Sequence, residues 1–188
     1  DATVLSQYRS IHSGETIVSP IFLHAGQFTA KGELSLRRPW PPCRQRSEGE
    51  KTVMHSHDLI SVSVGEIRPN GQGNLSLILQ AAAGEILPAY SAGAHIDIII
   101  PGVGPRQYSL CGTPDRSNTY EICVRLTDTS TGGSRYLHKQ VKSGDRLAIS
   151  PPRNHFPLPE AGRYLLFAGG IGITPLLAMA EAIAARKG

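Results

Sequence analysis

The stretch Phe167-Ala168-Gly169-Gly170-Ile171-Gly172-Ile173-Thr174-Pro175 joins two apolar segments. Residues 163–168 before it are typical of a short strand that is buried on both faces. Thr174 can cap a helix whose first position is Pro175, and apolar residues then recur at helical spacing. Because unpaired N–H groups point outward at a helix N-terminus, this order of strand, glycine turn and helix predicts an anion site. A tight turn without a ligand is the alternative.

A second motif, Arg106-Gln107-Tyr108-Ser109, lies some sixty residues upstream. Side chains two apart in an extended segment share a face, so Arg106 and Tyr108 project together, about 6.6 Å apart. A fixed charge beside a flat ring suits a ligand that carries a phosphate and an aromatic plane. Pro105 indicates that the segment starts at a strand edge or a loop exit. A solvated cation and a half-buried strand aromatic are the alternative interpretations.

The third motif is Thr131-Gly132-Gly133-Ser134-Arg135-Tyr136-Leu137-His138. Gly132 and Gly133 free the backbone to present N–H groups to an oxyanion, and Ser134 can cap a helix that we expect to run to about Val141. A phosphate held there would receive its counter-charge from Arg106. A glycine linker before a short surface helix is the alternative.

Short segments of alternating apolar and polar residues fill the region between residues 59 and 150. They predict six strands: Ser61–Arg68, Leu75–Gln80, Ala94–Pro101, Gln107–Cys111, Tyr120–Leu126 and Arg146–Ser150. Strands at this spacing suit a closed antiparallel barrel in which one helix precedes the last strand. The three motifs then fall at strand and loop ends, where ligands usually bind.

Four segments now carry a resemblance to a known family: Arg106–Cys111, Gly132–His138, Ser150–Leu158 and Gly169–Pro175. In this order they resemble the FMN-type reductases of the ferredoxin-NADP reductase superfamily, the group that includes phthalate dioxygenase reductase and the vanillate O-demethylase reductase component. The match runs from about Leu59 to Gly188. It implies a six-stranded antiparallel Greek-key barrel that binds a flavin, followed by the first strand and helix of a Rossmann-like nicotinamide domain.

The resemblance also implies a domain division. Residues 54–160 form the FMN-binding barrel, and residues 161–188 are the incomplete start of the NAD-binding domain. Residues 1–53 are expected to be disordered or a spurious extension, with Met54 as the natural start, because Ser35–Lys51 is basic, proline-rich and nearly free of apolar side chains. A partner-binding tail is the other interpretation of that stretch.

Site residues are carried over from the family by position. Arg106 would pair with the FMN phosphate, Tyr108 would lie against the isoalloxazine, and Ser109 would hydrogen-bond near the reactive flavin nitrogen. The remaining flavin-binding positions are Leu110, Val124, Arg125, Gly132, Gly133 and Ser134, of which the last three complete the phosphate cradle and Val124 and Arg125 line the flavin's edge. The positions that would receive NADH are Gly169, Gly170, Gly172 and Thr174. No catalytic side chain is expected, because the flavin carries the chemistry.

The implied function is a reductase component that passes electrons from NADH through FMN and a 2Fe-2S centre to a terminal oxygenase, a Rieske-type aromatic-ring oxygenase or O-demethylase. The three cysteines, Cys43, Cys111 and Cys123, do not match C-x4-C-x2-C, so the iron–sulfur centre is expected only in a full-length protein of which this chain is a fragment. A stand-alone flavin or ferredoxin reductase that uses FAD or FMN is the alternative. A flavin-binding module without turnover is the second.

Composition excludes some other classes. The net charge of +4 is scattered, without an Arg/Lys run interleaved with aromatics, so no nucleic-acid partner is expected. No stretch approaches the about 20 apolar residues that span a membrane. An odd number of cysteines without a disulfide-like pattern favours the cytoplasm. No metal site is expected at His55 and His57, because apart from Asp58 no nearby Cys, Asp or Glu completes a shell. His95 suits the barrel wall, and His138 and His155 suit surfaces near the flavin.

Overall fold

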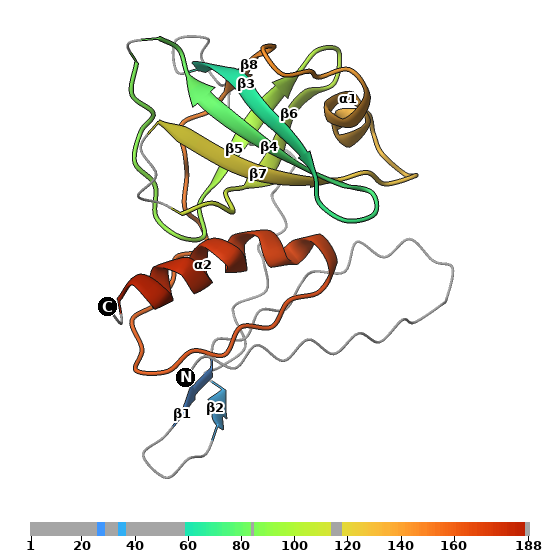
Figure 1. The fold of residues 1–188 in the computed structure, drawn as a ribbon. Helices are drawn as coiled ribbons and strands as arrows, with labels where there is room; N and C mark the ends of the chain where they lie inside the picture. Colours follow the sequence, from blue (N-terminus) through green and yellow to red (C-terminus); the bar gives the residue numbers. More distant parts are fainter. Residues whose placement is uncertain (1–25, 29–33, 37–58, 84, 114–117, 187–188) are drawn as a thin grey trace, which may run out of the picture. The chain divides into compact units, whose positions relative to one another are not determined.

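The computed structural model describes residues 26–28, 34–36, 59–83, 85–113 and 118–186. They fall into two compact units, one comprising residues 1–52 and 159–173 and the other residues 53–158 and 174–188. The second unit contains the principal β-sheet (Figure 1).

A two-stranded hairpin lies in the N-terminal extension. Strand β1 (Gly26–Phe28) pairs antiparallel with β2 (Leu34–Leu36), with Phe28 opposite Leu34. These two strands are not predicted from the sequence, because three-residue strands are too short to produce a recognisable period. The rest of residues 1–53, with Met54, His55 and His57, lies outside the described residues.

Six antiparallel strands form the sheet of the second unit, as the sequence predicts. The strands are β3 (Ile60–Pro69), β4 (Asn74–Ala81), β5 (His95–Ile100), β6 (Gly104–Ser109), β7 (Thr119–Arg125) and β8 (Arg146–Ile149). Their spatial order is β6-β5-β8-β3-β4-β7, so the last strand of the chain pairs with both β3 and β5. Helix α1 (Gly133–Lys139) connects β7 to β8, as expected, and ends two residues before the predicted Val141.

The sheet is not a fully closed barrel. Its edge strands β6 and β7 have no continuous ladder and are joined by a single bridge, Leu110 to Ile122, beside which the Cys111 N–H donates to the Glu121 carbonyl at 2.9 Å. Pro105 lies in β6 and has no N–H to donate, which suits an edge strand. The expectation of complete closure is therefore corrected to an open, curled sheet.

The hydrophobic core lies on one face of this curled sheet. Alternate residues of the strands are buried there, as a period of two requires. The fully buried side chains include Val62, Val64, Leu77, Leu79, Ile96, Ile98, Ile100, Ile122 and Ile149. Leu137 of α1 is fully buried in the core and Tyr136 packs partly against it, so apolar side chains anchor the helix to the sheet.

Two loops at one end of the sheet interlock. Gly93 has φ +95°, and a Cβ at this position would lie 1.8 Å from the carbonyl oxygen of Phe156. Asn154 fastens the same contact, because its Nδ2 donates to Ser91 Oγ at 2.6 Å and to the Ala92 carbonyl at 3.0 Å. The motif of residues 150–158 therefore serves to close this end of the fold.

The glycine stretch is built differently from the prediction. Residues 163–168 form no strand, since the described residues include no neighbouring parallel strand with which they could pair. A 3-10 turn, η2 (Gly170–Gly172), leads directly into α2 (Ile173–Ala185). The helix therefore begins before Thr174, which lies in its first turn rather than at the predicted cap.

Candidate ligand site

Arg106 is held at the loop that precedes α1. Its Nη1 donates to the carbonyl of Pro105 at 2.9 Å and to that of Val103 at 3.3 Å, and its Nη2 donates to Thr131 Oγ1 at 3.4 Å. The guanidinium of β6 is therefore fixed beside the Thr131–Ser134 segment, as the second and third motifs together predict.

Gly133 makes this approach possible. A Cβ at position 133 would lie 2.8 Å from Arg106 Cγ and 3.3 Å from Tyr108 Oη. Gly132 has φ +110°, and a Cβ there would lie 2.9 Å from Val103 Cγ2. The two glycines thus provide a cradle that a side chain would fill, with a cation and a phenol at its wall.

The start of α1 is capped by a residue that the sequence prediction missed. Gly132 occupies the N-cap position, and Ser130 Oγ accepts hydrogen bonds from the N–H groups of Gly132 at 3.2 Å and Arg135 at 3.4 Å. Ser134 donates its hydroxyl to the same oxygen at 2.8 Å. Ser130 therefore supplies the capping oxygen that the prediction assigned to Ser134. A serine three residues before Gly133 is the signal that could have indicated it.

Tyr108 is half-buried on the core face of β6, opposite Ile96 of β5. Burial raises the pKa of Tyr108, and the neighbouring Arg106 partly opposes that effect by favouring the phenolate. The ring is therefore a neutral phenol at physiological pH. Its hydroxyl can both donate and accept a hydrogen bond at the edge of the cradle.

The other flavin positions lie apart from this cluster. Ser109 pairs in register with His95 on the opposite face of β6. The side chains of Leu110 and Val124 are in the core, with 0% and 1% exposure, so any ligand contact from these positions would come from the backbone. Arg125 is exposed at the end of β7. The structure therefore brings together Arg106, Tyr108, Gly132 and Gly133, and places Ser109 beside His95.

Histidines support the site from neighbouring elements. His138 of α1 places Nε2 2.8 Å from the Val124 carbonyl and so ties the helix to β7. His95 lies in the sheet, as predicted, with 8% exposure. His155 is exposed and packs its ring edge-to-face on His95, with centroids 5.1 Å apart.

The nicotinamide positions divide between the two units. Gly169, Gly170 and Gly172 belong to the unit of residues 159–173, where Gly170 has φ +55° and a Cβ at Gly169 would meet no atom within 4 Å. Thr174 belongs to the unit that contains the sheet and is 6% exposed. The glycine backbone is thus open to an approaching group.

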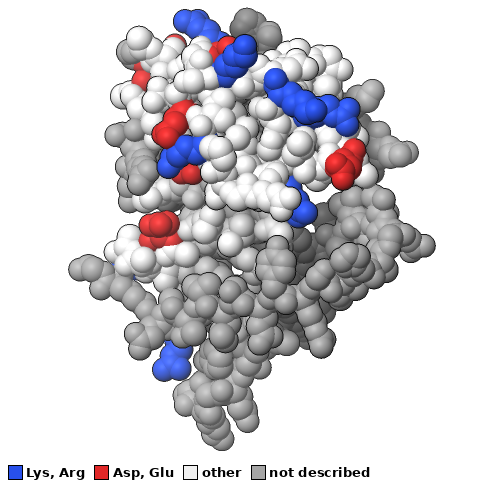
Figure 2. Space-filling view, turned by 45° about the vertical axis from the view of Figure 1, so that its right-hand side comes forward, with Lys and Arg blue, Asp and Glu red and all other residues white. Residues whose placement is uncertain are grey.

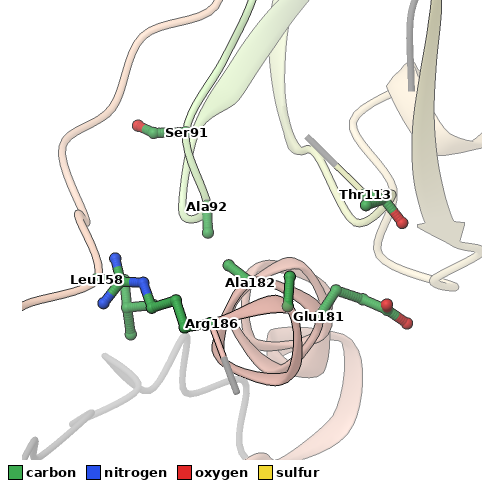
Figure 3. A pocket seen from close by; sticks show the side chains of 8 residues that line it. Ser91, Ala92, Thr113, Leu158, Glu181, Ala182 and Arg186 are labelled. Carbon is green, nitrogen blue, oxygen red and sulfur yellow. The ribbon is translucent and has the colours of Figure 1, made fainter. Parts of the chain in front are cut away.

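Two hollows lie elsewhere on the second unit. One, of about 340 Å³, lies between α2 and the loops that carry Ser91, Ala92 and Thr113, with Glu181 and Arg186 at its wall (Figure 3). The other, of about 200 Å³, is lined by residues that include Glu66, Arg68 and Glu121. Neither is lined by Arg106, Tyr108, Gly132 or Gly133.

Basic and acidic side chains are mixed on the face that Figure 2 shows. Figure 2 shows Lys and Arg side chains among Asp and Glu on the described part of that face, rather than one continuous basic surface. Within the described ranges, no three His, Cys, Asp or Glu side chains gather to hold a metal ion. None of the helices in those ranges has the length and apolar character that crossing a bilayer requires.

The named proteins similar to this chain include oxidoreductases and reductase subunits. No protein-family model matches it. It is 50% identical over 128 residues to vanillate O-demethylase oxidoreductase of Pseudomonas putida, a match that covers 68% of this chain and 40% of that protein. It is 44% identical over 134 residues to the carnitine monooxygenase reductase subunit of Escherichia coli, covering 68% of this chain and 41% of that one.

A solved structure supports the same grouping. Phthalate dioxygenase reductase, described as a modular structure for electron transfer from pyridine nucleotides to 2Fe-2S, superposes with a TM-score of 0.63 at 31% identity. The match covers 69% of this chain and 41% of that one. The chain therefore spans about two fifths of the length of these relatives.

Proposed function

Because the chain belongs to the reductases of the ferredoxin-NADP reductase superfamily, we propose that its six-stranded unit binds a flavin, FMN, and takes part in electron transfer from NADH to an oxygenase. The observation that carries this proposal is the approach of Gly133 to Arg106 and Tyr108. A cation, a phenol and a glycine backbone converge there, and these are the groups that a phosphate and an aromatic ring system require.

The residues present fit this cofactor. Arg106 supplies a full positive charge for the phosphate, and the N–H groups of Gly133 and Ser134 supply donors, while the N–H of Gly132 is already bonded to Ser130 Oγ at 3.2 Å. Tyr108 offers a flat ring beside them. Since Arg106 already bonds two carbonyls, its position is set before the ligand arrives, which reduces the entropy lost on binding.

The flavin and the protein would have different roles in the reaction. A bound flavin supplies the exchange between hydride transfer and single-electron transfer, while the protein positions and tunes it. Ser109, at the end of β6, is proposed to hydrogen-bond near the reactive flavin nitrogen. Leu110, Val124 and Arg125 would contribute backbone or edge contacts. Gly169, Gly170, Gly172 and Thr174 would receive NADH, and the pyridine nucleotides named for the phthalate dioxygenase reductase structure support this assignment.

The partner is proposed to be a terminal oxygenase. The similar proteins are named for vanillate O-demethylase and carnitine monooxygenase systems, and one is a reductase subunit. Electrons would leave through a 2Fe-2S centre outside this sequence, since Cys43, Cys111 and Cys123 have none of the cluster spacing. A reducing cytoplasm is the compartment that suits free cysteines.

Titration with FMN, FAD and riboflavin tests the proposal. We expect the 188-residue chain to bind FMN more tightly than riboflavin, seen as quenched flavin fluorescence and shifted visible absorption. Tighter binding of FAD would favour the alternative cofactor. Anaerobic NADH then distinguishes a reductase, whose flavin bleaches, from a flavin-binding module, which stays yellow. Failure to bind any flavin would contradict the proposal.

A further inference from the structure

His95 holds a buried polar atom that lacks a partner. Its side chain is almost fully enclosed, and Nε2 makes no hydrogen bond, the one buried side-chain atom in this condition within the described part of the chain. Buried polar groups in native proteins are nearly always paired, so an orphan of this kind points to a hydrogen bond that forms when a neighbouring side chain turns toward it.

The backbone around His95 is fixed on one side. His95 and Arg153 exchange hydrogen bonds, N–H to carbonyl, at 2.9 Å in each direction. The ring is fixed as well, since it packs edge-to-face on His155. The imidazole of His95, at the start of β5, is therefore held against the loop that follows β8.

The other side of His95 faces Ser109. The two residues are directly opposite in the β5–β6 register. Because the His95 N–H and carbonyl both bond to Arg153, this pair is of the non-hydrogen-bonded type, in which side chains come closest, with Cβ atoms about 4.5–5.5 Å apart. At that separation, rotation about the Ser109 Cα–Cβ bond can bring its hydroxyl toward the imidazole, with which it makes no hydrogen bond in this structure.

Burial, helped by neighbouring charges, keeps the imidazole of His95 neutral. Burial, Arg153 and His155 lower the pKa of His95, while Asp97 opposes them. Arg153 is itself ion-paired with Asp97. A neutral imidazole presents one donor and one acceptor nitrogen, and either can pair with a hydroxyl.

We propose that His95 is a positioning residue, whose Nε2 hydrogen-bonds the Ser109 hydroxyl and turns it toward the bound flavin. The inference rests on the proposed function, because Ser109 has this role only if a flavin is bound. His95 itself does not touch the reacting atoms. Its hydrogen bond selects one of the orientations that are open to the Ser109 hydroxyl.

Histidine NMR tests the contact directly. In the 188-residue chain labelled with 15N-histidine, addition of FMN is expected to shift the Nε2 resonance of His95, and Ser109→Ala is expected to abolish that shift. A structural histidine with no link to Ser109 would respond in the same way in both proteins. An Nε2 signal that FMN leaves unmoved, or moves equally in Ser109→Ala, would overturn the proposal.

A double-mutant cycle measures the coupling. We expect His95→Phe to weaken FMN binding about 2- to 10-fold, the range of one hydrogen bond, and to have no further effect in the Ser109→Ala background. His95→Gln, which retains an Nε2, should recover part of the loss. The matched control is Gln107→Ala, on the same face of β6 two residues away, which should combine additively with His95→Phe. Additivity with Ser109→Ala would contradict the coupling.

The outcomes separate the two proposals. A wild-type chain that binds no flavin contradicts the proposed function. A chain that binds FMN normally but shows neither the resonance shift nor the coupling contradicts the role of His95 alone. The NMR comparison requires no change at His95, so it holds even if His95→Phe fails to fold.

Discussion

Gly133 and Arg106 approach so closely that a methyl group on Gly133 would lie 2.8 Å from Arg106 Cγ. The contact joins the start of α1 to the edge strand β6. It also links two sequence motifs that are more than twenty residues apart. The affinity of the cradle for a phosphate should therefore depend on the absence of a side chain at Gly133.

Gly133→Ala is expected to weaken FMN binding about tenfold, because Arg106 must move and its charge-assisted hydrogen bond to the phosphate is then strained. The free energy of unfolding should change little. The cost of moving Arg106 is offset by the helix propensity of alanine, which exceeds that of glycine by up to about 1 kcal/mol. Fluorescence titration and urea unfolding measure the two quantities. Gly162→Ala, where a Cβ meets no atom within 4 Å, is the control. Equal FMN affinity in both variants would contradict the cradle.

Arg106→Ala should separate phosphate recognition from ring recognition. We expect the FMN dissociation constant to rise about 10- to 100-fold while that of riboflavin, which has no phosphate, stays within about twofold. Arg68→Ala is the matched control, because Arg68 is an exposed arginine paired with Glu66 at 3.2 Å elsewhere on the sheet. Equal losses for the two ligands would show that Arg106 acts through folding rather than through the phosphate.

Gly93→Ala should be strongly destabilising. The backbone at φ +95° disfavours any side chain, and the new methyl would collide with the Phe156 carbonyl, so we expect a loss above about 3 kcal/mol. Gly102→Ala has a similar φ of +70° but open space, and should lose only about 1–2 kcal/mol. Urea unfolding distinguishes them. Similar losses in the two variants would mean that the interlocked loops contribute little.

Alkaline pH should weaken the fold through Cys111. Burial first, then Glu121 and Cys123, raise the pKa of the Cys111 thiol from 9.0 to about 12. A group with a raised folded-state pKa stabilises the protein fully below its unfolded pKa and loses that contribution as pH rises, here between about 9 and 12. The loss is about 1.4 kcal/mol per pH unit in that window. Cys111→Ala should show a smaller fall in urea midpoint between pH 8 and pH 10 than wild type, and an equal fall would exclude Cys111 as the cause.

Most of the sheet could be predicted from the sequence, because each strand has one buried face. The predicted bounds of the strand at Leu75–Gln80 lie within β4, and those at Ser61–Arg68 lie within β3. The predicted strand Gln107–Cys111 is displaced from the observed strand β6, which begins at Gly104 and includes Pro105. Proline normally argues against a strand, and only its edge position, which depends on the whole topology, makes it acceptable.

The candidate site was predicted in part. The sequence predicts the cluster of Arg106, Tyr108, Gly132 and Gly133, because short motifs that need an unusual backbone conformation can be recognised in a sequence. Ser130 was missed, since a capping oxygen two residues before the N-cap depends on the φ of Gly132. The pairing of Ser109 with His95 could not be predicted, because register between strands is a property of the tertiary fold.

The position of β8 has a consequence for synthesis of the protein. This strand is the last of the sheet to be translated, yet it lies between β3 and β5. A nascent chain that has not reached Arg146 holds two ladders, β5–β6 and β3–β4–β7, connected by the Leu110–Ile122 bridge. The exposed edges of β5 and β3 both lack β8 as their pairing partner. The sheet can therefore assemble only after the ribosome has released Arg146–Ile149, and such late, long-range pairing makes folding slow.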